Sequence, residues 1–221
     1  MDGNRRYGER QFGRARRLEG HQAGGKKLGE VVEWCVDCGV REVTCFAFST
    51  ENWRRDPAEI DCLMKTFVGR CDAIKKKAQE KRIRVRVLCT DNRLPEDVDT
   101  ALQALVDETR TYDGFVLNLA VSYGSRMEIA EAAKAVATDV KNGLLDPNDI
   151  TEDTITKHLQ LPDAPDLLVR TSGERRISNF LLWQLAYTEL VFIDKLWPDL
   201  SRRDFDSLLR TFANRHRRFG M

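Results

Sequence analysis

The amino-acid sequence predicts an α/β fold: a single domain over residues 1–221, with a mostly parallel central β-sheet of about six strands flanked by helices. Runs with strand character alternate with helical patterns along the whole chain, and no internal repeat or low-complexity linker interrupts them. The length also suits one domain that buries a substantial core. In such sheets ligands bind outside the carboxyl ends of the strands, so a site is expected in the polar segments that follow strands.

The first half of the chain contains two helix–strand units. Apolar positions at helical spacing predict a helix over residues 23–38, which Gly39 can end. Residues 40–48, rich in β-branched and aromatic side chains, then predict a buried strand, followed by a polar loop over 49–55. A capping Asp56, with Pro57 at the first helical position, begins a long helix.

The second half continues the alternation. Residues 83–87 alternate apolar residues with arginine, which predicts a strand with one wet face near a sheet edge. The remaining expected strands cover residues 115–121, 167–169 and 190–193. Helices are expected over residues 94–109, 126–141 and 151–159. A further helix is expected to begin at about residue 180, and the last one after a capping box at 201–204.

The first 25 residues are almost devoid of core-forming side chains. They hold six arginines, one histidine and an Asp-Gly-Asn turn signal. The composition fits either a binding loop or a disordered basic arm.

Charge and cysteine content exclude several classes of protein. Lys+Arg 36 against Asp+Glu 35 gives a net charge of +1, so no global field recruits nucleic acid, and any anion site must come from local clustering. The six cysteines lack zinc-site spacing and read as reduced thiols of a cytoplasmic protein. No apolar run approaches the roughly 20 residues of a membrane span, and no secretory signal is present. A peripheral membrane contact stays open.

The segment 166–193 carries the strongest local signal. A short apolar run ends at Arg170, and Arg175 and Arg176 follow a Thr-Ser-Gly turn. Guanidinium groups bind phosphate oxygens bidentately, and backbone N–H groups of a turn add partial positive charge. The segment is either an anion site or a solvated arginine cluster.

Several blocks occur together in one order along the chain. They are MDGNRR (1–6), EGHQAG (19–24), FAFSTENWRR (46–55), LNLAVSYGSR (117–126), DLLVRTSGERRISNFLLWQ with TELVF (166–192), and RFG (218–220). In this combination the chain resembles the cis-prenyltransferases, the undecaprenyl diphosphate synthase family that also includes dehydrodolichyl diphosphate synthases. The resemblance covers essentially the whole chain.

The resemblance implies an enzyme that joins isopentenyl diphosphate units to an allylic diphosphate such as farnesyl diphosphate, with each new double bond cis. Two diphosphates must lie side by side, and arginines, main-chain amides and Mg²⁺ offset their repulsion. By the same resemblance, Asp2 and Glu189 hold Mg²⁺, and Asn52 orients the reacting groups or relays the lost proton. Without the family match, Asp2 reads as a turn residue and Glu189 as a surface acid.

The resemblance also assigns the substrate-binding residues. The allylic diphosphate is expected at the N-terminal blocks and the isopentenyl diphosphate at the arginine segment, while the RFG element reaches a diphosphate across the interface of a homodimer. The residues are Gly3, Asn4, Arg5, Arg6, Tyr7, Arg17 and His21; Ser49, Thr50, Glu51, Trp53 and Arg55 of the second loop; Arg170, Arg175, Arg176 and Ser178; and Arg218 and Gly220.

Three further expectations follow. An apolar tunnel beside the small Ala47 should accept the growing chain and give a medium- to long-chain product. The family places a strand directly before the MDGN motif, so that strand is expected to be missing before Met1, by truncation or by loss. The alternatives are a non-catalytic accessory subunit of a heteromeric prenyltransferase and a generic phosphate- or nucleic-acid-binding domain; the intact motifs argue against the first and the near-zero charge against the second.

Overall fold

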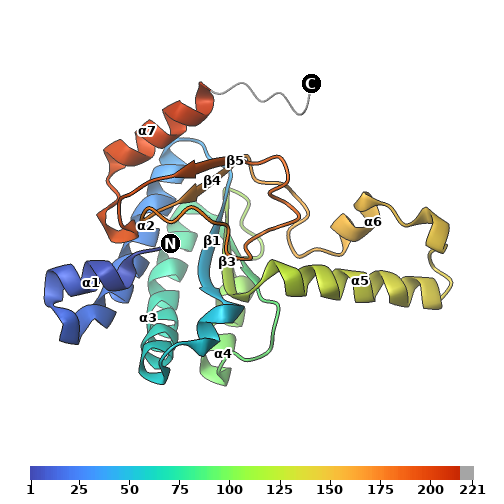
Figure 1. The fold of residues 1–221 in the computed structure, drawn as a ribbon, viewed down its shortest axis with the longest axis horizontal. Coiled ribbons are helices and arrows are strands. Elements are labelled where there is room, and N and C mark those ends of the chain that lie inside the picture. Colours follow the sequence, from blue (N-terminus) through green and yellow to red (C-terminus); the bar gives the residue numbers. More distant parts are fainter. Residues whose placement is uncertain (215–221) are drawn as a thin grey trace.

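The computed structural model describes residues 1–214, and Arg218 and Gly220 of the RFG block lie outside them. Within these residues all strand pairs are parallel, in a three-stranded sheet of order β1-β3-β2 and a two-stranded sheet of β4 and β5 (Figure 1). The α/β fold and parallel pairing are confirmed, with five strands rather than about six. The strands are β1 (Glu42–Ser49), β2 (Ile83–Leu88), β3 (Phe115–Tyr123), β4 (Leu167–Arg170) and β5 (Glu189–Phe192).

Strand β3 lies at the centre of the larger sheet, and both of its faces are buried. One face carries Phe115, Leu117, Leu119 and Val121, each at most 4% exposed, and the other carries the fully buried Asn118 and Ala120, as expected of a strand covered on both sides. Strand β2, with its alternating arginines, occupies an edge, as its sequence predicted.

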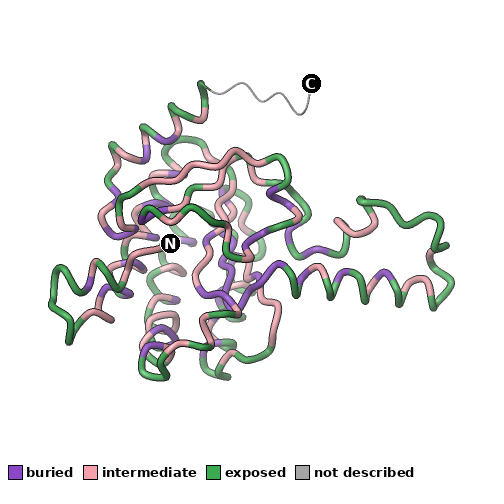
Figure 2. Tube along the Cα trace, in the orientation of Figure 1, coloured by how far each residue is buried: buried purple, intermediate pink, exposed green. Residues whose placement is uncertain are grey.

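Helices surround the sheets. Helices α2 and α3 pack against each other, α3 and α4 pack against β2, and α7 contacts α2. Helix α5 projects away from the sheets, with α6 beside it, and the connection between the two is mostly exposed (Figures 1 and 2). The helices are α1 (Asn4–Phe12), α2 (Gly20–Asp37), α3 (Pro57–Lys81), α4 (Glu96–Thr109), α5 (Ser125–Lys141), α6 (Glu152–Lys157) and α7 (Arg202–Ala213).

The predicted helix starts are made as the sequence indicated. Asp56 Oδ1 accepts a hydrogen bond from Ala58 N at 2.9 Å, and Ser201 and Asp204 form a reciprocal capping box. Among residues 1–214 no helix combines the length and the apolar character that crossing a bilayer requires.

The arginine-rich N-terminus folds into helix α1 and the 3₁₀ helix η1 (Arg14–Glu19), so the expectation of a loop or a disordered arm is wrong. Close backbone packing replaces side-chain packing here. A Cβ added to Gly8 would lie 2.0 Å from the Arg17 carbonyl oxygen, and one added to Gly20 would lie 1.8 Å from that of Asn4. Composition missed this helix because glycines let the backbones touch without apolar side chains.

The helix expected from about residue 180 is also wrong. Ser178, Asn179 and Leu181 have φ of 56°, 62° and 46°, and such left-handed residues interrupt an α-helix. The apolar residues of this segment are nevertheless buried: the Phe180 ring stacks on Phe46 with ring centroids 4.5 Å apart. The segment therefore contributes to the core as a series of turns.

Candidate active site

A cavity of about 440 Å³ opens between the N-terminal segment, helix α2 and the carboxyl end of β1. It gathers polar and charged residues from blocks far apart in the sequence, together with an apolar wall. The residues predicted for the site that line it are Asp2, Gly3, Asn4, Arg5, Arg6, Arg17, His21, Ser49, Asn52, Arg55 and Ser178. Met1, Phe46, Ala47, Phe48 and Leu63 form the apolar wall.

The first turn of α1 faces this cavity. Gly3 precedes the helix with φ 94°, and a Cβ there would lie 2.2 Å from Ser172 Oγ. Tyr7 N donates to Gly3 O at 2.8 Å, so the amides of residues 4–6 precede the first intrahelical hydrogen bond. Free amides and the positive end of the helix dipole make this turn a ready anion site.

Asp2 joins the N-terminus to the arginine segment. Arg170 Nε donates to Asp2 Oδ2 at 2.8 Å, and the Asp2 carbonyl oxygen accepts from Ser172 Oγ at 2.6 Å and from Trp197 N at 3.0 Å. Arg170 Nη1 also donates to Ser178 Oγ at 2.8 Å. Residues separated by 168 to 170 positions in the sequence thus form one site, as the ordered blocks suggested.

Glu59 is a functional candidate that the sequence does not single out, because an acid in the first turn of a helix is common. Its carboxylate is 4% exposed and receives Arg5 Nη1 at 3.0 Å, Arg55 Nη1 at 2.9 Å and His21 Nε2 at 3.4 Å. The available signal was its i+4 spacing from Arg55 across the start of α3. Glu59 fixes two arginines and a histidine along one wall of the cavity.

Burial lowers the pKa of His21, with the positive charge of Arg55 adding to the shift, while Glu59 opposes it. Nε2 lies 3.4 Å from Glu59 Oε1, but neither buried ring nitrogen makes a well-formed hydrogen bond within residues 1–214. A buried polar group without a partner in the protein commonly has a functional role or contacts an ion or an ordered water. His21 can therefore present a ring N–H to an anion in the cavity.

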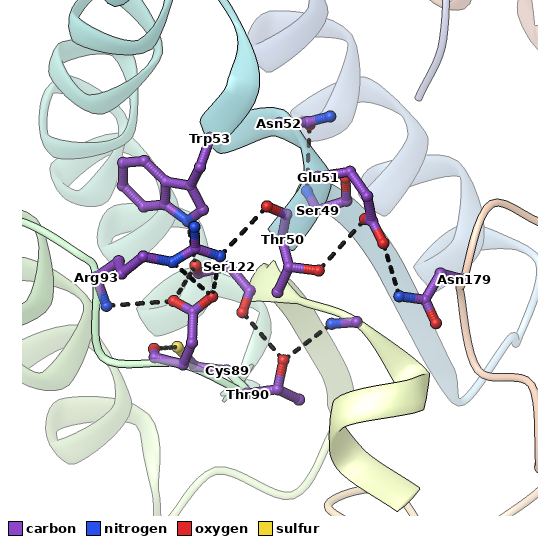
Figure 3. A network of polar contacts seen from close by, with 12 residues as sticks. Ser49, Thr50, Glu51, Asn52, Trp53, Cys89, Thr90, Arg93, Ser122 and Asn179 are labelled. Atoms are coloured by element: carbon purple, nitrogen blue, oxygen red, sulfur yellow. Dashed lines mark hydrogen bonds and ion pairs between the residues drawn. The ribbon is translucent and has the colours of Figure 1, made fainter. Parts of the chain in front are cut away.

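The loop after β1 forms the 3₁₀ helix η2 (Thr50–Arg54), which carries Asn52. Asn52 Oδ1 accepts from Ser49 N at 3.2 Å, so the amide nitrogen of Asn52 is its free donor end, and it points away from the Trp53 network in Figure 3. Trp53 Nε1 donates to Ser122 Oγ at 2.7 Å, and Asn179 Nδ2 donates to Glu51 Oε1 at 2.8 Å. Thr50, Glu51 and Trp53 therefore support the loop rather than line the cavity.

Other predicted residues lie apart from the cavity. The Tyr7 ring packs against Phe12, with centroids 6.4 Å apart, and Arg175 is exposed. Arg176 forms an ion pair with Glu174, whose other oxygen accepts from Arg6 Nη2 at 3.2 Å. Glu174 therefore links the allylic and isopentenyl sides as they were assigned from the sequence.

The two expected metal ligands are not brought together. Glu189 pairs with Leu167 at the start of β4, whereas Asp2 contacts Arg170 at the end of that strand. Three residues of strand separate these ends by roughly 10 Å. Within residues 1–214 no group of three His, Cys, Asp or Glu side chains could hold a metal ion. The side chain of Asp2, 40% exposed at the cavity, fits an ion held by one carboxylate and by substrate phosphates, as Mg²⁺ commonly is.

Comparison with known proteins finds similarity over the full length of the chain. Residues 1–220 match the family described as "Putative undecaprenyl diphosphate synthase". A geranylgeranyl-diphosphate-specific tritrans,polycis-undecaprenyl-diphosphate synthase of Thermococcus kodakarensis is 43% identical, with 100% of this chain and 84% of the relative covered. A (2E,6E)-farnesyl-diphosphate-specific ditrans,polycis-undecaprenyl-diphosphate synthase of Xanthomonas axonopodis pv. citri is 41% identical, with 100% and 86% covered.

A solved structure supports the fold directly. Lavandulyl diphosphate synthase from Lavandula x intermedia, in complex with dimethylallyl diphosphate, superimposes with a TM-score of 0.95 at 33% identity, covering 100% of this chain and 95% of that chain. The sequence blocks, the cavity that unites them and these full-length similarities agree. The chain belongs to the undecaprenyl diphosphate synthase family of prenyltransferases.

Proposed function

We propose that this chain is a cis-polyprenyl diphosphate synthase that condenses isopentenyl diphosphate units onto an allylic diphosphate, with farnesyl diphosphate as the favoured primer. The observation that carries the proposal is the cavity itself, which combines a helix N-terminus and arginines with an apolar wall of Phe46, Ala47 and Leu63. An allylic diphosphate has the matching two parts, a dianionic or trianionic head and an apolar tail. A medium- to long-chain product requires the apolar wall to continue as a tunnel, which remains part of the proposal.

The allylic head would lie at the first turn of α1. The amides of residues 4–6 and the side chains of Arg5, Arg6 and Arg17 face that position, and His21 can add a neutral N–H donor. These donors are fixed before the substrate arrives, so they can stabilise the charge that grows on the departing diphosphate. The isopentenyl head would lie at Arg170, Arg176 and Ser178.

Mg²⁺ is the proposed cofactor, and it would neutralise phosphate charge and assist departure of the diphosphate. Asp2 would hold the ion together with phosphate oxygens. Glu189 would be a metal ligand only if another arrangement of the chain brought it to the ion. In this structure β4 and β5 hold it at the end of the strand pair opposite to the one near Asp2.

Asn52 is proposed to orient the reacting groups. Its oxygen is engaged by the Ser49 N–H, so the group available to substrates is an N–H donor. A donor can hold a phosphate or hydroxyl-like oxygen in place but cannot accept the proton lost in the condensation. Between the two roles expected from the sequence, the geometry favours orientation over proton relay.

A homodimer and a peripheral membrane contact are proposed on the family resemblance, and Arg218 and Gly220 would serve the partner's site. The competing function is an accessory subunit without catalysis. The assembled cavity, with Asp2 and Asn52 both facing it, favours the catalytic reading.

The test incubates purified protein with labelled isopentenyl diphosphate, Mg²⁺ and, in parallel, farnesyl, geranylgeranyl or dimethylallyl diphosphate. Mass spectrometry of the products should show a polyprenyl series with the farnesyl primer, and chelation with EDTA should abolish it. Accumulation of a single condensation product would refute the chain-length proposal. No product with any primer, from folded protein, would favour the accessory subunit.

A further inference from the structure

A polar network supports the loop that carries Asn52 (Figure 3). Its centre is Asp91, in the segment that follows β2, and its side chain is only 10% exposed. Neither the sequence motifs nor the cavity includes Asp91. Its contacts nevertheless converge on the two residues that flank Glu51 and Asn52, namely Thr50 and Trp53.

The first route from Asp91 to the loop passes through Ser122. Ser122 Oγ donates to Asp91 Oδ1 at 2.6 Å and accepts from Trp53 Nε1 at 2.7 Å. The order of donors is fixed, because an ionised carboxylate only accepts and an indole N–H only donates. Asp91 thus sets the direction of the Ser122 hydroxyl, and that hydroxyl holds the Trp53 ring.

The second route passes through Arg93. Its Nε and Nη2 donate to Asp91 Oδ2 at 3.1 and 2.6 Å, and Nη2 also donates to the Thr50 carbonyl oxygen at 3.3 Å. The guanidinium carbon lies 5.4 Å from the centroid of the Trp53 ring, within cation–π range. Asp91 therefore holds both ends of the turn that presents Asn52.

The network is held in a conformation that the backbone alone would not favour. Ser122 is fully buried with φ 51°, a left-handed conformation that few non-glycine residues adopt. Its carbonyl oxygen accepts from Thr90 N at 3.1 Å, and Thr90 Oγ1 donates to the same oxygen at 3.3 Å. Conformations of this kind persist only where the surroundings determine them, and they concentrate near functional sites. Here the result is a Ser122 hydroxyl aimed at Trp53.

We infer that Asp91 is a positioning residue for the catalytic loop: through Ser122 and Arg93 it fixes Trp53 and Thr50, and so the direction of the Asn52 amide. It touches no substrate and acts only through these residues. The kinetic part of the inference rests on the proposed prenyltransferase activity, and the structural part does not. A network that merely joined the ends of β2 and β3 would affect stability without affecting the orientation of the loop.

The test reads the orientation of Trp53 directly. The chain has four tryptophans, so 5-fluorotryptophan labelling gives a small set of ¹⁹F resonances, and Trp53→Phe identifies the one that belongs to Trp53. Asp91→Asn and Ser122→Ala should shift or broaden that resonance and leave the others in place. Asp99→Asn, an exposed acid on α4 in the same part of the chain, is the matched control and should change none of them.

Kinetics supply the second readout. Asp91→Asn and Ser122→Ala should each lower kcat about tenfold while KM for both diphosphates changes less than about threefold, because substrate binding is retained. The double variant should be no slower than either single variant, since both act through Trp53. The test does not depend on the more disruptive variant Asp91→Ala: if that variant fails to fold, Asp91→Asn and Ser122→Ala still decide the question.

The outcomes are distinguishable. An unmoved Trp53 resonance in both variants, or additive losses in the double variant, would overturn the inference. If wild-type protein forms no product with any primer, the proposed function fails, and the ¹⁹F spectra alone then judge whether Asp91 positions the loop.

Discussion

Replacing the buried carboxylate of Glu59 tests whether the cavity wall proposed to bind the allylic diphosphate is held in place before the substrate binds. Glu59→Gln keeps the size of the side chain but removes its charge and puts an N–H₂ group where an oxygen meets Arg5 or Arg55. Hydrogen bonds to a charged group contribute about 1.5–3 kcal/mol each. The Arg5 and Arg55 side chains are 49% and 35% exposed, so solvent screening reduces this contribution. We expect a net loss of about 1–2 kcal/mol in folding stability and in allylic diphosphate binding.

A loss of this size is easily measured. It corresponds to roughly a 5–30-fold weaker affinity for the allylic diphosphate and a melting temperature lower by about 2–8 °C for a chain of this length. Calorimetric titration with a non-hydrolysable allylic diphosphate analogue measures the first, and thermal denaturation measures the second.

The control is Glu33→Gln, which breaks the exposed ion pair between Lys77 of α3 and Glu33 of α2 and should leave both quantities nearly unchanged. If Glu59→Gln lowers the melting temperature but binds the analogue as tightly as wild type, Glu59 is structural only. The orientation argument for Arg5 and Arg55 would then be refuted.

Three further perturbations address the other parts of the site. Gly3→Ala should weaken binding of the allylic diphosphate analogue by at least tenfold in the same calorimetric titration, because φ 94° and the close approach to Ser172 Oγ oppose a Cβ. Adding Ser172→Gly should restore part of the lost affinity. Wild-type affinity in Gly3→Ala alone would contradict this prediction. Asn52→Asp keeps the oxygen that accepts from Ser49 N but removes the donor, so the melting temperature should hold while kcat falls about 100-fold; an active variant would exclude the donor role. Burial, with Arg55, holds the pKa of His21 below its ordinary value of 6.5, so as pH falls the unfolded chain binds the proton first. The free energy of unfolding should therefore decrease as pH drops below about 6.5 toward the lower folded-state pKa. Urea unfolding should show this pH dependence in wild type and a smaller one in His21→Gln, and equal slopes would count against it.

The sequence carried most of the fold because local patterns and tertiary packing agree in the centre of the chain. β3, the Asp56 cap and the Ser201 capping box all follow rules that act within a few residues. Helix α1 could not be predicted in this way, because what stabilises it is contact between the Gly8 and Gly20 backbones and residues that are distant in sequence. The turns near residue 180 likewise depend on burial of Phe180 against Phe46, which no local rule contains.

The sequence predicts the candidate site as a set of residues but not as an arrangement. The family blocks supplied Asp2, His21 and Asn52, and the structure adds that Asp2 Oδ2 and Asn52 Oδ1 already accept hydrogen bonds while the ring nitrogens of His21 make none within residues 1–214. Glu59 and Asp91 were missed since an acid at a helix start or after a strand looks like any surface acid in sequence. Only burial and three-dimensional convergence distinguish them.

The carboxylates of the site explain how a chain of net charge +1 could offer the two proposed diphosphate sites. Four arginines of the site pair with three acids: Arg5 and Arg55 with Glu59, Arg6 with Glu174, and Arg170 with Asp2. Arginines without such partners would repel one another and lose their common direction. A guanidinium group has five N–H donors, so one acid can fix it and still leave donors for phosphate. The acids therefore orient the cations without consuming them, and the local field at the cavity stays positive although the molecule as a whole is almost neutral.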